Sequence, residues 1–462
     1  MQQSVNKFFD YIAGKRVAFC GVGRTNLPLI KMFSQKGALV TACDSKREDQ
    51  LADVIKQLEP YNIQFMLGPE YLQNLDFDII FRSPGLKFST PELVEARQRG
   101  SIVTSEMEVF FDLCPCKIIA VTGSDGKTTT TTIISEILKQ DGKTVHLGGN
   151  IGTPLLPIIE DIREDDVAVV ELSSFQLISM RKSPDIAVVT NLSPNHLDVH
   201  KDMQEYIEAK RNIILHQNAF SRAVLNLDNE VTRQFGADVR GERLFFSTQN
   251  SCDNGVYLRN DLIYFSKNSD AQPVLNVNDI LIPGRHNVEN YMAAIGAVFG
   301  NVSIESIKAV AKNFNGVEHR IEFVRDFDGV KYYNDSIASS PTRTICGTLS
   351  LFSQRIILIC GGYDKKISFD AMGPVVAGKV KVLILLGQTA SKIREAVVNS
   401  PNFSADLLKI VHAKDMFEAV NLARSLASPG DVVSLSPACA SFDLYENFMQ
   451  RGAHFKDIVN KL

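Results

Sequence analysis

The sequence predicts an α/β protein of three domains: an N-terminal Rossmann-like domain, a central domain with a P-loop ATPase-type parallel sheet, and a C-terminal Rossmann-like domain. The chain has 462 residues, enough for about three domains of ordinary size. Short runs of continuously apolar residues alternate with stretches of helical periodicity. Continuous apolarity is typical of parallel strands that are covered by helices on both faces. Because the apolar runs form three groups, we expect three sheets.

We expect the domains to span residues 1–115, 116–317 and 318–462. The apolar runs that define them are residues 16–23, 38–44, 77–85 and 101–105 in the first domain, 117–123, 167–174 and 186–193 in the second, and 355–362, 380–387 and 431–441 in the third. Residues 222–284 contain only weak strand patterns, such as "RLFFS" and "LIYFS", so we expect an irregular part of the central domain there.

The composition is that of a soluble globular protein, with 45% hydrophobic residues, 22% charged residues and a formal net charge of -4. Nothing in it predicts a nucleic-acid partner. The N-terminus lacks the apolar stretch of a secretory signal, and no segment approaches the roughly 18 apolar residues of a membrane span. We therefore expect a cytoplasmic monomer without membrane insertion. Its eight cysteines lie in apolar contexts typical of buried free thiols, and the close pair Cys114 and Cys116 lacks the further ligands of a zinc site.

A glycine-rich turn in the first domain predicts a nucleotide-phosphate site. The stretch "GVGRTN", residues 21–26, follows a strand and precedes a helix, and Asp44 ends the next strand. Glycines let backbone amides approach a phosphate, and a helix N-terminus favours an anion. Asn26 occupies the place of the third glycine in G-x-G-x-x-G, so a phosphorylated nucleotide other than a redox dinucleotide fits at least as well.

The central domain opens on a shortened phosphate-binding loop, "VTGSDGKTTTTT", at residues 121–132. The Walker A pattern is G-x-x-x-x-G-K-[ST], whereas only two residues separate Gly123 from Gly126 here. The other parts are present: a strand, free backbone amides, the charge of Lys127, the hydroxyl of Thr128 for magnesium, and a helix. A tight turn with a merely solvated lysine is the alternative, but the coincidence of all these parts favours triphosphate binding.

Two further side chains follow strands of the central domain. Glu171 ends the apolar run "VAVVE", and His196 follows the next strand. Ligands of open α/β sheets bind beyond the carboxyl ends of the strands, so these residues predict a magnesium or phosphate site at that edge. Lys210, by contrast, lies in the helical pattern "YIEAKRNII" and on sequence alone is expected to be solvated.

Together these residues resemble the Mur ligases, the ATP-dependent amide-forming enzymes of peptidoglycan synthesis. The family's loop has the short form T-G-x-x-G-K-[ST], which "TGSDGKT" matches with Asp125 where many members have Asn. The resemblance is closest to the branch that adds D-glutamate to UDP-N-acetylmuramoyl-L-alanine. Segments that carry it include "RSPG", "GGNIGTPLL", "VELSSFQL", "NHLDVH", "EAKRNI", "GRHNVENYMAA", "NDSIASSPT", "GGYDK" and, most specifically, "LSPACASFDLYENFMQRGAHF".

The resemblance implies a role for each matching residue. It places the UDP-sugar at Arg24, Thr25, Asp44, Ser45, Ser83 and Asn150, and ATP at Gly123, Ser124, Asp125, Gly126, Lys127, Thr128, Thr129, Asn290, Arg320 and Asp335. It implies two magnesium ions held by Thr128, Glu171, His196 and Lys210, with Lys210 carbamylated, and catalytic roles for Lys127, Glu171, His196 and Lys210. D-Glutamate is expected at Ser339, Lys365, Ser441 and Phe448. One departure is Ile337, where some members have a lysine in "NDSKAT".

The implied reaction activates the alanine carboxylate of the UDP-sugar as an acyl phosphate, which the amine of D-glutamate then attacks, with release of ADP and phosphate. Folylpolyglutamate synthase shares the loop and the chemistry, but it lacks a complete Rossmann-like unit before the ATP-binding domain. A Mur ligase with another amino-acid acceptor is disfavoured by the C-terminal segment. A nucleotide-dependent switch would need only the loop and Glu171 and would leave the third α/β unit unexplained.

Overall fold

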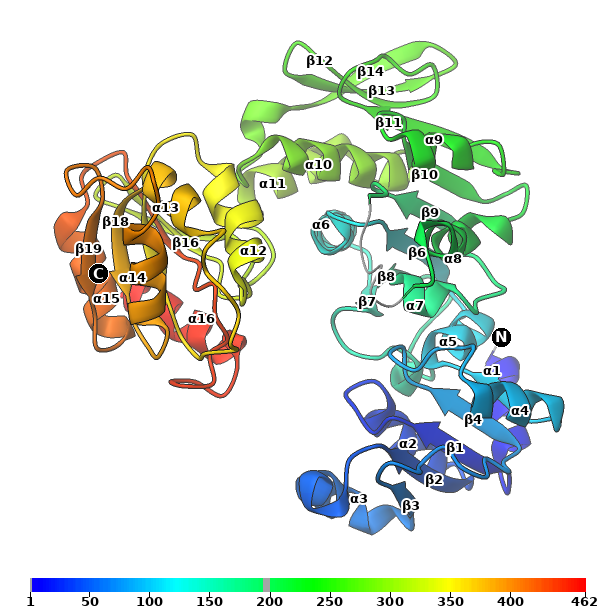
Figure 1. Ribbon diagram of the computed structural model, residues 1–462. Coiled ribbons are helices and arrows are strands. Elements are labelled where there is room, and N and C mark those ends of the chain that lie inside the picture. The colour runs from blue at the N-terminus through cyan, green and yellow to red at the C-terminus, as the bar shows by residue number, and fades with distance from the viewer. Residues whose placement is uncertain (1, 194–199) are drawn as a thin grey trace. The chain divides into compact units, whose positions relative to one another are not determined.

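The computed structural model describes residues 2–193 and 200–462, and the chain divides into two compact units (Figure 1). The first unit comprises residues 1–279 and 285–312, and the second comprises residues 280–284 and 313–462. The first unit contains two sheets and the second contains one, which confirms the predicted α/β class with three sheets. The individual limits expected for the three domains stay predictions.

The first sheet has five parallel strands in the order β3-β2-β1-β4-β5. Its elements are α1 (Gln2–Ile12), β1 (Arg16–Cys20), α2 (Asn26–Gln35), β2 (Leu39–Asp44), α3 (Ala52–Leu58), β3 (Gln64–Leu67), β4 (Ile79–Arg82), α4 (Pro91–Gln98), β5 (Ile102–Thr104) and α5 (Glu106–Leu113). Successive residues of β1 serve opposite faces: Phe19 packs in a core with Phe33 of α2, while Ala18 packs in another with Leu93 of α4. Burial on both faces explains why the strand is apolar throughout.

The second sheet has nine strands in the order β14-β13-β12-β11-β10-β9-β6-β8-β7. Its strands are β6 (Lys117–Thr122), β7 (Val145–Gly149), β8 (Val167–Glu171), β9 (Ile186–Val189), β10 (Arg222–Asn226), β11 (Glu242–Ser247), β12 (Gly255–Arg259), β13 (Leu262–Lys267) and β14 (Asp270–Asn276). Its helices are α6 (Lys127–Gln140), α7 (Ser174–Leu177), α8 (Met203–Leu215), α9 (Glu230–Phe235), α10 (Arg285–Val298) and α11 (Ile304–Asn313). The pairs from β7 to β12 are parallel, and the last two pairs are antiparallel.

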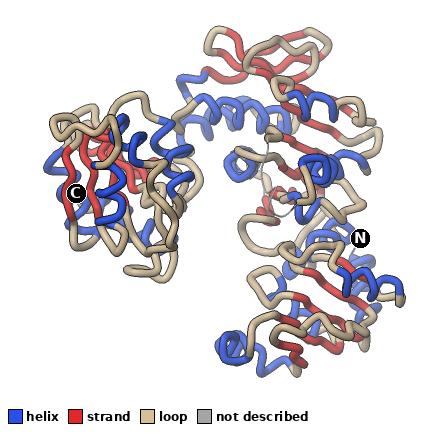
Figure 2. Tube along the Cα trace, in the orientation of Figure 1, coloured by secondary structure: helices blue, strands red, loops and turns tan. Residues whose placement is uncertain are grey.

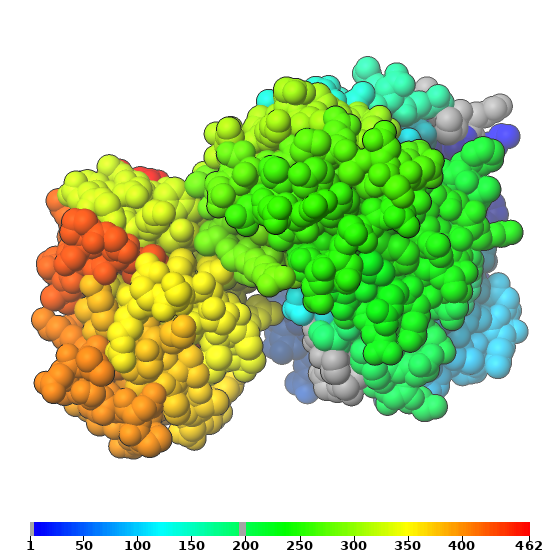
Figure 3. Space-filling view, turned by 90° about the horizontal axis from the view of Figure 1, so that it is seen from above, coloured from blue at the N-terminus to red at the C-terminus, as the bar shows by residue number. Residues whose placement is uncertain are grey.

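Residues 222–276 are regular, so the expectation of an irregular segment is wrong. The five strands β10 to β14 lie in this segment, and Figure 3 shows its residues in green as one continuous surface of the first unit. Two-residue turns at 260–261 and 268–269 join the antiparallel strands, with positive φ at all four residues. Such turns usually carry glycine, but here they are Asn-Asp and Asn-Ser, so the hairpin signal was weak.

The second unit contains a six-stranded sheet in the order β15-β16-β20-β17-β18-β19, parallel except for the β15 and β16 pair. Its elements are β15 (Glu322–Phe327), β16 (Val330–Asn334), α12 (Pro341–Thr344), β17 (Ile356–Cys360), α13 (Gly373–Lys379), β18 (Val380–Leu385), α14 (Ala390–Val398), β19 (Lys409–His412), α15 (Met416–Leu426), β20 (Val432–Leu435) and α16 (Phe448–Asn460). One apolar core lies under α13 and α14 and another under α15 and α16, so helices cover both faces (Figure 2).

Glu106 links the two sheets of the first unit. It opens α5, is 3% exposed, and its Oε1 accepts hydrogen bonds from the backbone N–H groups of Leu155 and Leu156, each at 2.9 Å. Burial raises the pKa of Glu106 to about 7, because the loss of solvation outweighs the two hydrogen bonds that favour the charged form. The contribution of Glu106 to the stability of the protein therefore depends on pH.

None of the helices in the described parts of the chain is both long enough and apolar enough to cross a membrane.

We predict that Glu106→Gln changes the pH dependence of stability. The pKa of Glu106 in the folded state is about 7, whereas its usual value is 4.5. Protonation of this carboxyl therefore stabilises the fold, and its full contribution to the free energy of unfolding is present below pH 4.5. This contribution is lost as the pH rises through 7. Glutamine keeps the acceptor oxygen but never ionises. Urea denaturation should show that the free energy of unfolding of Glu106→Gln, relative to that of the wild type, rises by about 1–3 kcal/mol between about pH 5 and pH 8.

Asp112→Asn is the matched control, because Asp112 lies in the same helix with its side chain largely exposed. It should not reproduce the pH-dependent gain. A stability difference between Glu106→Gln and the wild type that stays constant across this pH range would contradict the assignment.

Candidate functional site

The loop between β6 and α6 requires glycine at two positions. Gly123 has φ +151° and Gly126 has φ +78°, both in the region that side chains disfavour. A Cβ atom on Gly123 would lie 1.9 Å from Thr190 Oγ1, and one on Gly126 would lie 2.3 Å from Asn290 Oδ1. The backbone of the loop therefore approaches its neighbours more closely than any other residue allows.

The segment after β9 fastens this loop. The N–H of Ser124 donates to Asn191 O at 2.8 Å, and the N–H of Asp125 donates to Asn191 Oδ1 at 3.0 Å. Thr190 Oγ1 donates to Asp125 O at 2.6 Å, and Ser124 Oγ lies 2.9 Å from the hydroxyl of Tyr206 in α8. A helix N-terminus favours an anion, so the start of α6 is the part of this loop that suits a phosphate group.

Lys127, the first residue of α6, folds back over the loop. Its Nζ donates to Gly123 O at 2.9 Å and to Ser124 O at 2.8 Å. The amine is thereby held at the loop, where a phosphate group would compete with the two carbonyl oxygens for it. This position agrees with the predicted role of a phosphate ligand.

Thr128 and Glu171 form the predicted metal-binding pair. Thr128 Oγ1 donates to Glu171 Oε2 at 2.7 Å, and Asn150 Nδ2 donates to Glu171 Oε1 at 2.7 Å. The carboxylate is 1% exposed, and no cation of the described residues lies within ion-pair distance of it. A buried carboxylate beside a hydroxyl fits a magnesium ion, which prefers oxygen ligands. Within residues 2–193 and 200–462, no group of three His, Cys, Asp or Glu side chains forms a metal cluster.

Lys210 is buried, contrary to the expectation of a solvated helical lysine. It is 2% exposed in α8, and its Nζ donates to Thr122 Oγ1 at 3.1 Å and to Gly123 O at 2.9 Å. Burial, with a further contribution from the charge of Lys127, lowers the pKa of Lys210 well below its usual value. Burial therefore makes the charged form of this amine less favourable than it is in a solvated lysine.

The other predicted nucleotide residues lie in different parts of the chain. Asn290 in α10 lies against the loop and accepts a hydrogen bond from Thr130 Oγ1 at 3.2 Å, and His196 falls outside the described residues. Arg320 and Asp335 belong to the second unit. Asp335 is buried, with hydroxyl donors Thr348 and Ser436 at 2.8 and 2.9 Å, and burial raises its pKa to about 6. The nucleotide roles of these residues stay predictions.

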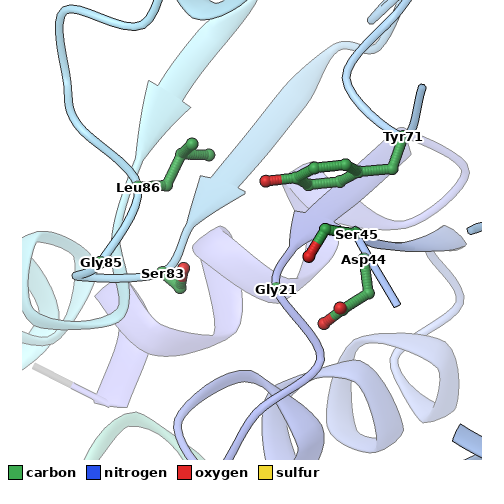
Figure 4. A pocket seen from close by; sticks show the side chains of 7 residues that line it. All are labelled: Gly21, Asp44, Ser45, Tyr71, Ser83, Gly85 and Leu86. Atoms are coloured by element: carbon green, nitrogen blue, oxygen red, sulfur yellow. The ribbon is translucent and has the colours of Figure 1, made fainter. Parts of the chain in front are cut away.

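A cavity of about 250 Å³ lies at the carboxyl edge of the first sheet (Figure 4). Its lining residues are Gly21, Asp44, Ser45, Tyr71, Ser83, Gly85 and Leu86. Three of these, Asp44, Ser45 and Ser83, were predicted to hold a UDP-sugar. Asp44 also supports the glycine-rich turn, since its Oδ2 accepts the N–H of Val22 at 2.8 Å. Sequence reasoning missed Tyr71, because an aromatic residue in a loop carries no nucleotide signal of its own.

The remaining residues predicted for the UDP-sugar connect the two sheets of the first unit. Arg24 donates to the carbonyl oxygen of Gly152, two residues after Asn150. Thr25 immediately precedes α2, and its side chain makes no capping hydrogen bond to that helix. The turn after β1 and the loop after β7 are therefore in contact, and Asn150 faces Glu171 rather than the cavity described above.

The residues predicted to bind D-glutamate follow neighbouring strands of the second unit. Ser339 follows β16, Lys365 follows β17, Ser441 follows β20 and Phe448 begins α16. Lys365 Nζ lies 3.5 Å from Ser339 O. Because β16, β20 and β17 are adjacent and parallel, the structure brings these segments to one edge of the sheet.

Arg451 holds these segments together and was missed by sequence reasoning. It is 3% exposed, and its guanidinium donates to Ser336 Oγ at 3.0 Å, Ser336 O at 2.8 Å, Ala440 O at 3.1 Å and Cys439 O at 3.1 Å. Burial lowers the pKa of Arg451 to about 10. In the sequence, only its position one helical turn after Phe448 could have drawn attention to Arg451, and this position does not reveal that the side chain is buried.

We predict that Arg451→Met destabilises the protein by about 2–4 kcal/mol, because it removes four hydrogen bonds and leaves buried carbonyl groups unpaired. Arg451→Lys should lose an intermediate amount of stability, since a single amine cannot reach all the oxygen atoms that the guanidinium contacts. Urea denaturation followed by circular dichroism measures both. Arg394→Met is the control, because Arg394 is exposed on α14; a loss for Arg451→Met no larger than the control's would disprove the bridging role.

Three domain descriptions match the sequence. Residues 15–105 match the Mur ligase MurD-like N-terminal domain, residues 121–298 match the Mur ligase middle domain, and residues 319–439 match the glutamate ligase domain of Mur ligases. These matches fall on the three sheets.

Full-length relatives are also similar. The chain is 50% identical to the UDP-N-acetylmuramoylalanine--D-glutamate ligase of Acetivibrio thermocellus and 48% identical to that of Ruminiclostridium cellulolyticum, with 100% of each chain covered in both comparisons. Among solved structures it resembles MurF from Acinetobacter baumannii (TM-score 0.59, 18% identity, 91% of each chain). It also resembles the UDP-N-acetylmuramate-alanine ligase MurC from Thermotoga maritima (TM-score 0.57, 17% identity, 97% of this chain and 99% of the other). At such identities the solved structures support the fold alone, but the full-length relatives confirm the resemblance: the chain belongs to the Mur ligase family.

Proposed function

We propose that the protein joins D-glutamate to UDP-N-acetylmuramoyl-L-alanine in peptidoglycan precursor synthesis, with conversion of ATP to ADP and phosphate. The observation that carries this proposal is the convergence of Lys127, Thr128, Glu171 and Lys210 at the phosphate loop. The full-length identity to relatives named as D-glutamate ligases supports the choice of substrates.

The reaction first needs two anions to approach each other. The alanine carboxylate of the UDP-sugar attacks the γ-phosphate of ATP, which gives an acyl phosphate and ADP. The amine of D-glutamate then attacks the acyl carbon, forms the amide and displaces phosphate. Lys127 lowers the barrier of the first step, because its ammonium group neutralises charge on the transferred phosphoryl group. To do so it exchanges the carbonyl oxygens of Gly123 and Ser124 for phosphate oxygens.

Thr128, Glu171, His196 and Lys210 are the proposed ligands of two magnesium ions. When bound, magnesium polarises phosphate oxygens and offsets their charge. The chain's contribution is to hold Glu171 dry and oriented, with Asn150 bonded to one carboxylate oxygen and Thr128 to the other. The family match and the burial of Glu171 beside Thr128 support this assignment.

A carbamate on Lys210 would convert a buried amine into an oxygen ligand. The neutral amine adds to carbon dioxide, forms an N–C bond and releases one proton. The lowered pKa of Lys210 supports this step, because only the neutral amine has a free electron pair. The product carries a carboxylate, which the bare amine beside Lys127 cannot supply to a metal ion.

The substrates would occupy the cavity of the first sheet and the carboxyl edge of the sheet in the second unit. The UDP part is assigned to Arg24, Thr25, Asp44, Ser45 and Ser83, with Asn150 toward the lactyl-alanine arm. D-Glutamate is assigned to Ser339, Lys365, Ser441 and Phe448, and Asn290, Arg320 and Asp335 to the nucleotide. We further propose that the protein acts as a monomer in the cytoplasm, where its nucleotide substrates are made.

The proposal predicts phosphate release that depends on ATP, magnesium, UDP-N-acetylmuramoyl-L-alanine and D-glutamate together. A coupled phosphate assay should give turnover with D-glutamate and none with L-glutamate, L-alanine or diaminopimelate. Turnover with another amino acid would keep the ligase chemistry and remove the D-glutamate assignment. No release with any acceptor would reject the ligase function.

We also predict that Lys210→Met lowers kcat by at least about 1,000-fold, while ATP still binds. Methionine fills the same buried volume but cannot form the carbamate. Acetate or formate should partly restore kcat to Lys210→Ala, which leaves space for a small carboxylate. Carbon-13 NMR of the wild type under labelled carbon dioxide should show a carbamate signal that Lys210→Met lacks. Full activity of Lys210→Met would remove the carbamate from the mechanism.

A further inference from the structure

A short turn after β16 carries one of the residues assigned to D-glutamate. In residues 337–339 the N–H of Ser339 donates to Ile337 O at 2.8 Å, and the N–H of Ala338 donates to Asp335 O at 2.9 Å. These bonds fix the turn at the carboxyl edge of the sheet in the second unit. Ile337 itself carries no charge, so any cation at this turn has to come from another segment.

Two cations from separate segments approach the turn. Lys365, which follows β17, places its Nζ 3.5 Å from Ser339 O. Arg343, in α12, places its Nη1 3.4 Å from Ile337 O. The two carbonyl groups are two residues apart in the chain, so both positive charges lie beside the same short turn.

Neither cation forms an ion pair with a described residue of the second unit. No carboxylate of its described residues lies within ion-pair distance of Arg343 or Lys365, and both side chains are exposed. The nearest acid in sequence, Asp364, is already engaged: Oδ2 pairs with Lys392 Nζ at 2.5 Å, and Oδ1 accepts the N–H of Lys366 at 2.8 Å. Other lysines of this unit, such as Lys381 and Lys456, do have acidic partners.

Two uncompensated cations beside a turn are suited to a ligand with two carboxylates. A monocarboxylate would leave one of the charges unpaired, whereas a dicarboxylic amino acid pairs both and keeps its amine free to react. Charge-assisted hydrogen bonds of this kind are about twice as strong as neutral ones, and an arginine can bind a carboxylate in bidentate fashion. The arrangement therefore favours an acidic amino acid over a neutral one.

We propose that Arg343 is a specificity-determining residue that binds one carboxylate of the D-glutamate acceptor, while Lys365 binds the other. This inference rests on the proposed function. Arg343 supplies the positive charge that Ile337 does not, and it does so from the helix that follows the same turn. The residue at position 337 can be apolar because Arg343, six residues later in the chain, brings a positive charge to the same turn.

The test is steady-state kinetics of Arg343→Ala, Arg343→Lys and the control Arg394→Ala, an exposed arginine on α14. Arg343→Ala should raise the KM for D-glutamate by about 10- to 100-fold, the effect of losing one charge-assisted hydrogen-bonded pair. The KM values for ATP and for the UDP-sugar should stay within twofold. Arg343→Lys keeps the charge without the bidentate geometry and should give an intermediate KM, and Arg394→Ala should match the wild type.

Inhibition by two analogues identifies the carboxylate. D-Glutamine lacks the side-chain carboxylate, and 4-aminobutyrate lacks the α-carboxylate. Each analogue is measured as a competitive inhibitor of D-glutamate, and its inhibition constant is compared between the wild type and Arg343→Ala. The analogue that lacks the carboxylate bound by Arg343 should have the same inhibition constant in both.

An unchanged KM for D-glutamate in Arg343→Ala would overturn the inference, as would an equal rise in the KM values of all three substrates or an Arg343→Lys variant as impaired as the alanine variant. These outcomes presuppose D-glutamate-dependent phosphate release by the wild type. Without such release the proposed function fails first, so the two failures are distinguishable.

Discussion

Glu171 is a carboxylate held almost entirely out of water at the end of β8, and the architecture around the phosphate loop follows from that burial. Removing a carboxylate from water costs several kcal/mol unless polar groups replace its solvation, so the fold has to supply hydrogen-bond donors and positive charge around it. Thr128 at the start of α6 and Asn150 after β7 both donate to it. The close approach also constrains Gly149, where a Cβ atom would lie 2.3 Å from Glu171 O. The start of α6 and the loop after β7 thus hold the carboxylate in one orientation at the end of the strand.

The same principle operates in the second unit for one cation and one anion. Arg451 is buried among carbonyl and hydroxyl oxygens, and Asp335 is buried among hydroxyl groups. Each charged group bonds to segments that follow different strands, and its hydrogen bonds add to backbone bonds that already join these loops, such as that from the N–H of Gly361 to Pro437 O at 2.8 Å. Uncharged partners hold these buried groups, whereas Arg343 and Lys365 are exposed.

The sequence predicted the three sheets and the phosphate loop because both depend on local patterns: apolar runs, glycines and a lysine at fixed spacing. The resemblance assigned both Thr128 and Glu171 to magnesium, but the hydrogen bond between them was visible only in the structure. What the sequence could not reveal was burial of polar residues. Lys210 has the same helical context as a solvated lysine, and only the packing of α8 against the loop shows that it is buried. Arg451 was missed for the same reason, whereas Tyr71 was missed because an aromatic residue in a loop carries no nucleotide signal.

Arg82 connects the cavity of the first sheet with the segment that leaves Glu171. It ends β4, is 1% exposed, and donates to Phe175 O at 3.0 Å and Ser179 Oγ at 2.6 Å near α7, as well as to Leu86 O at 3.2 Å. Ser83 to Leu86 contribute to the cavity wall, while α7 begins three residues after Glu171. Because these bonds are buried, the cavity wall cannot shift without either carrying α7 with it or leaving polar groups unpaired. The guanidinium thus couples the position of the cavity wall in the first sheet to that of α7, which follows Glu171 in the second.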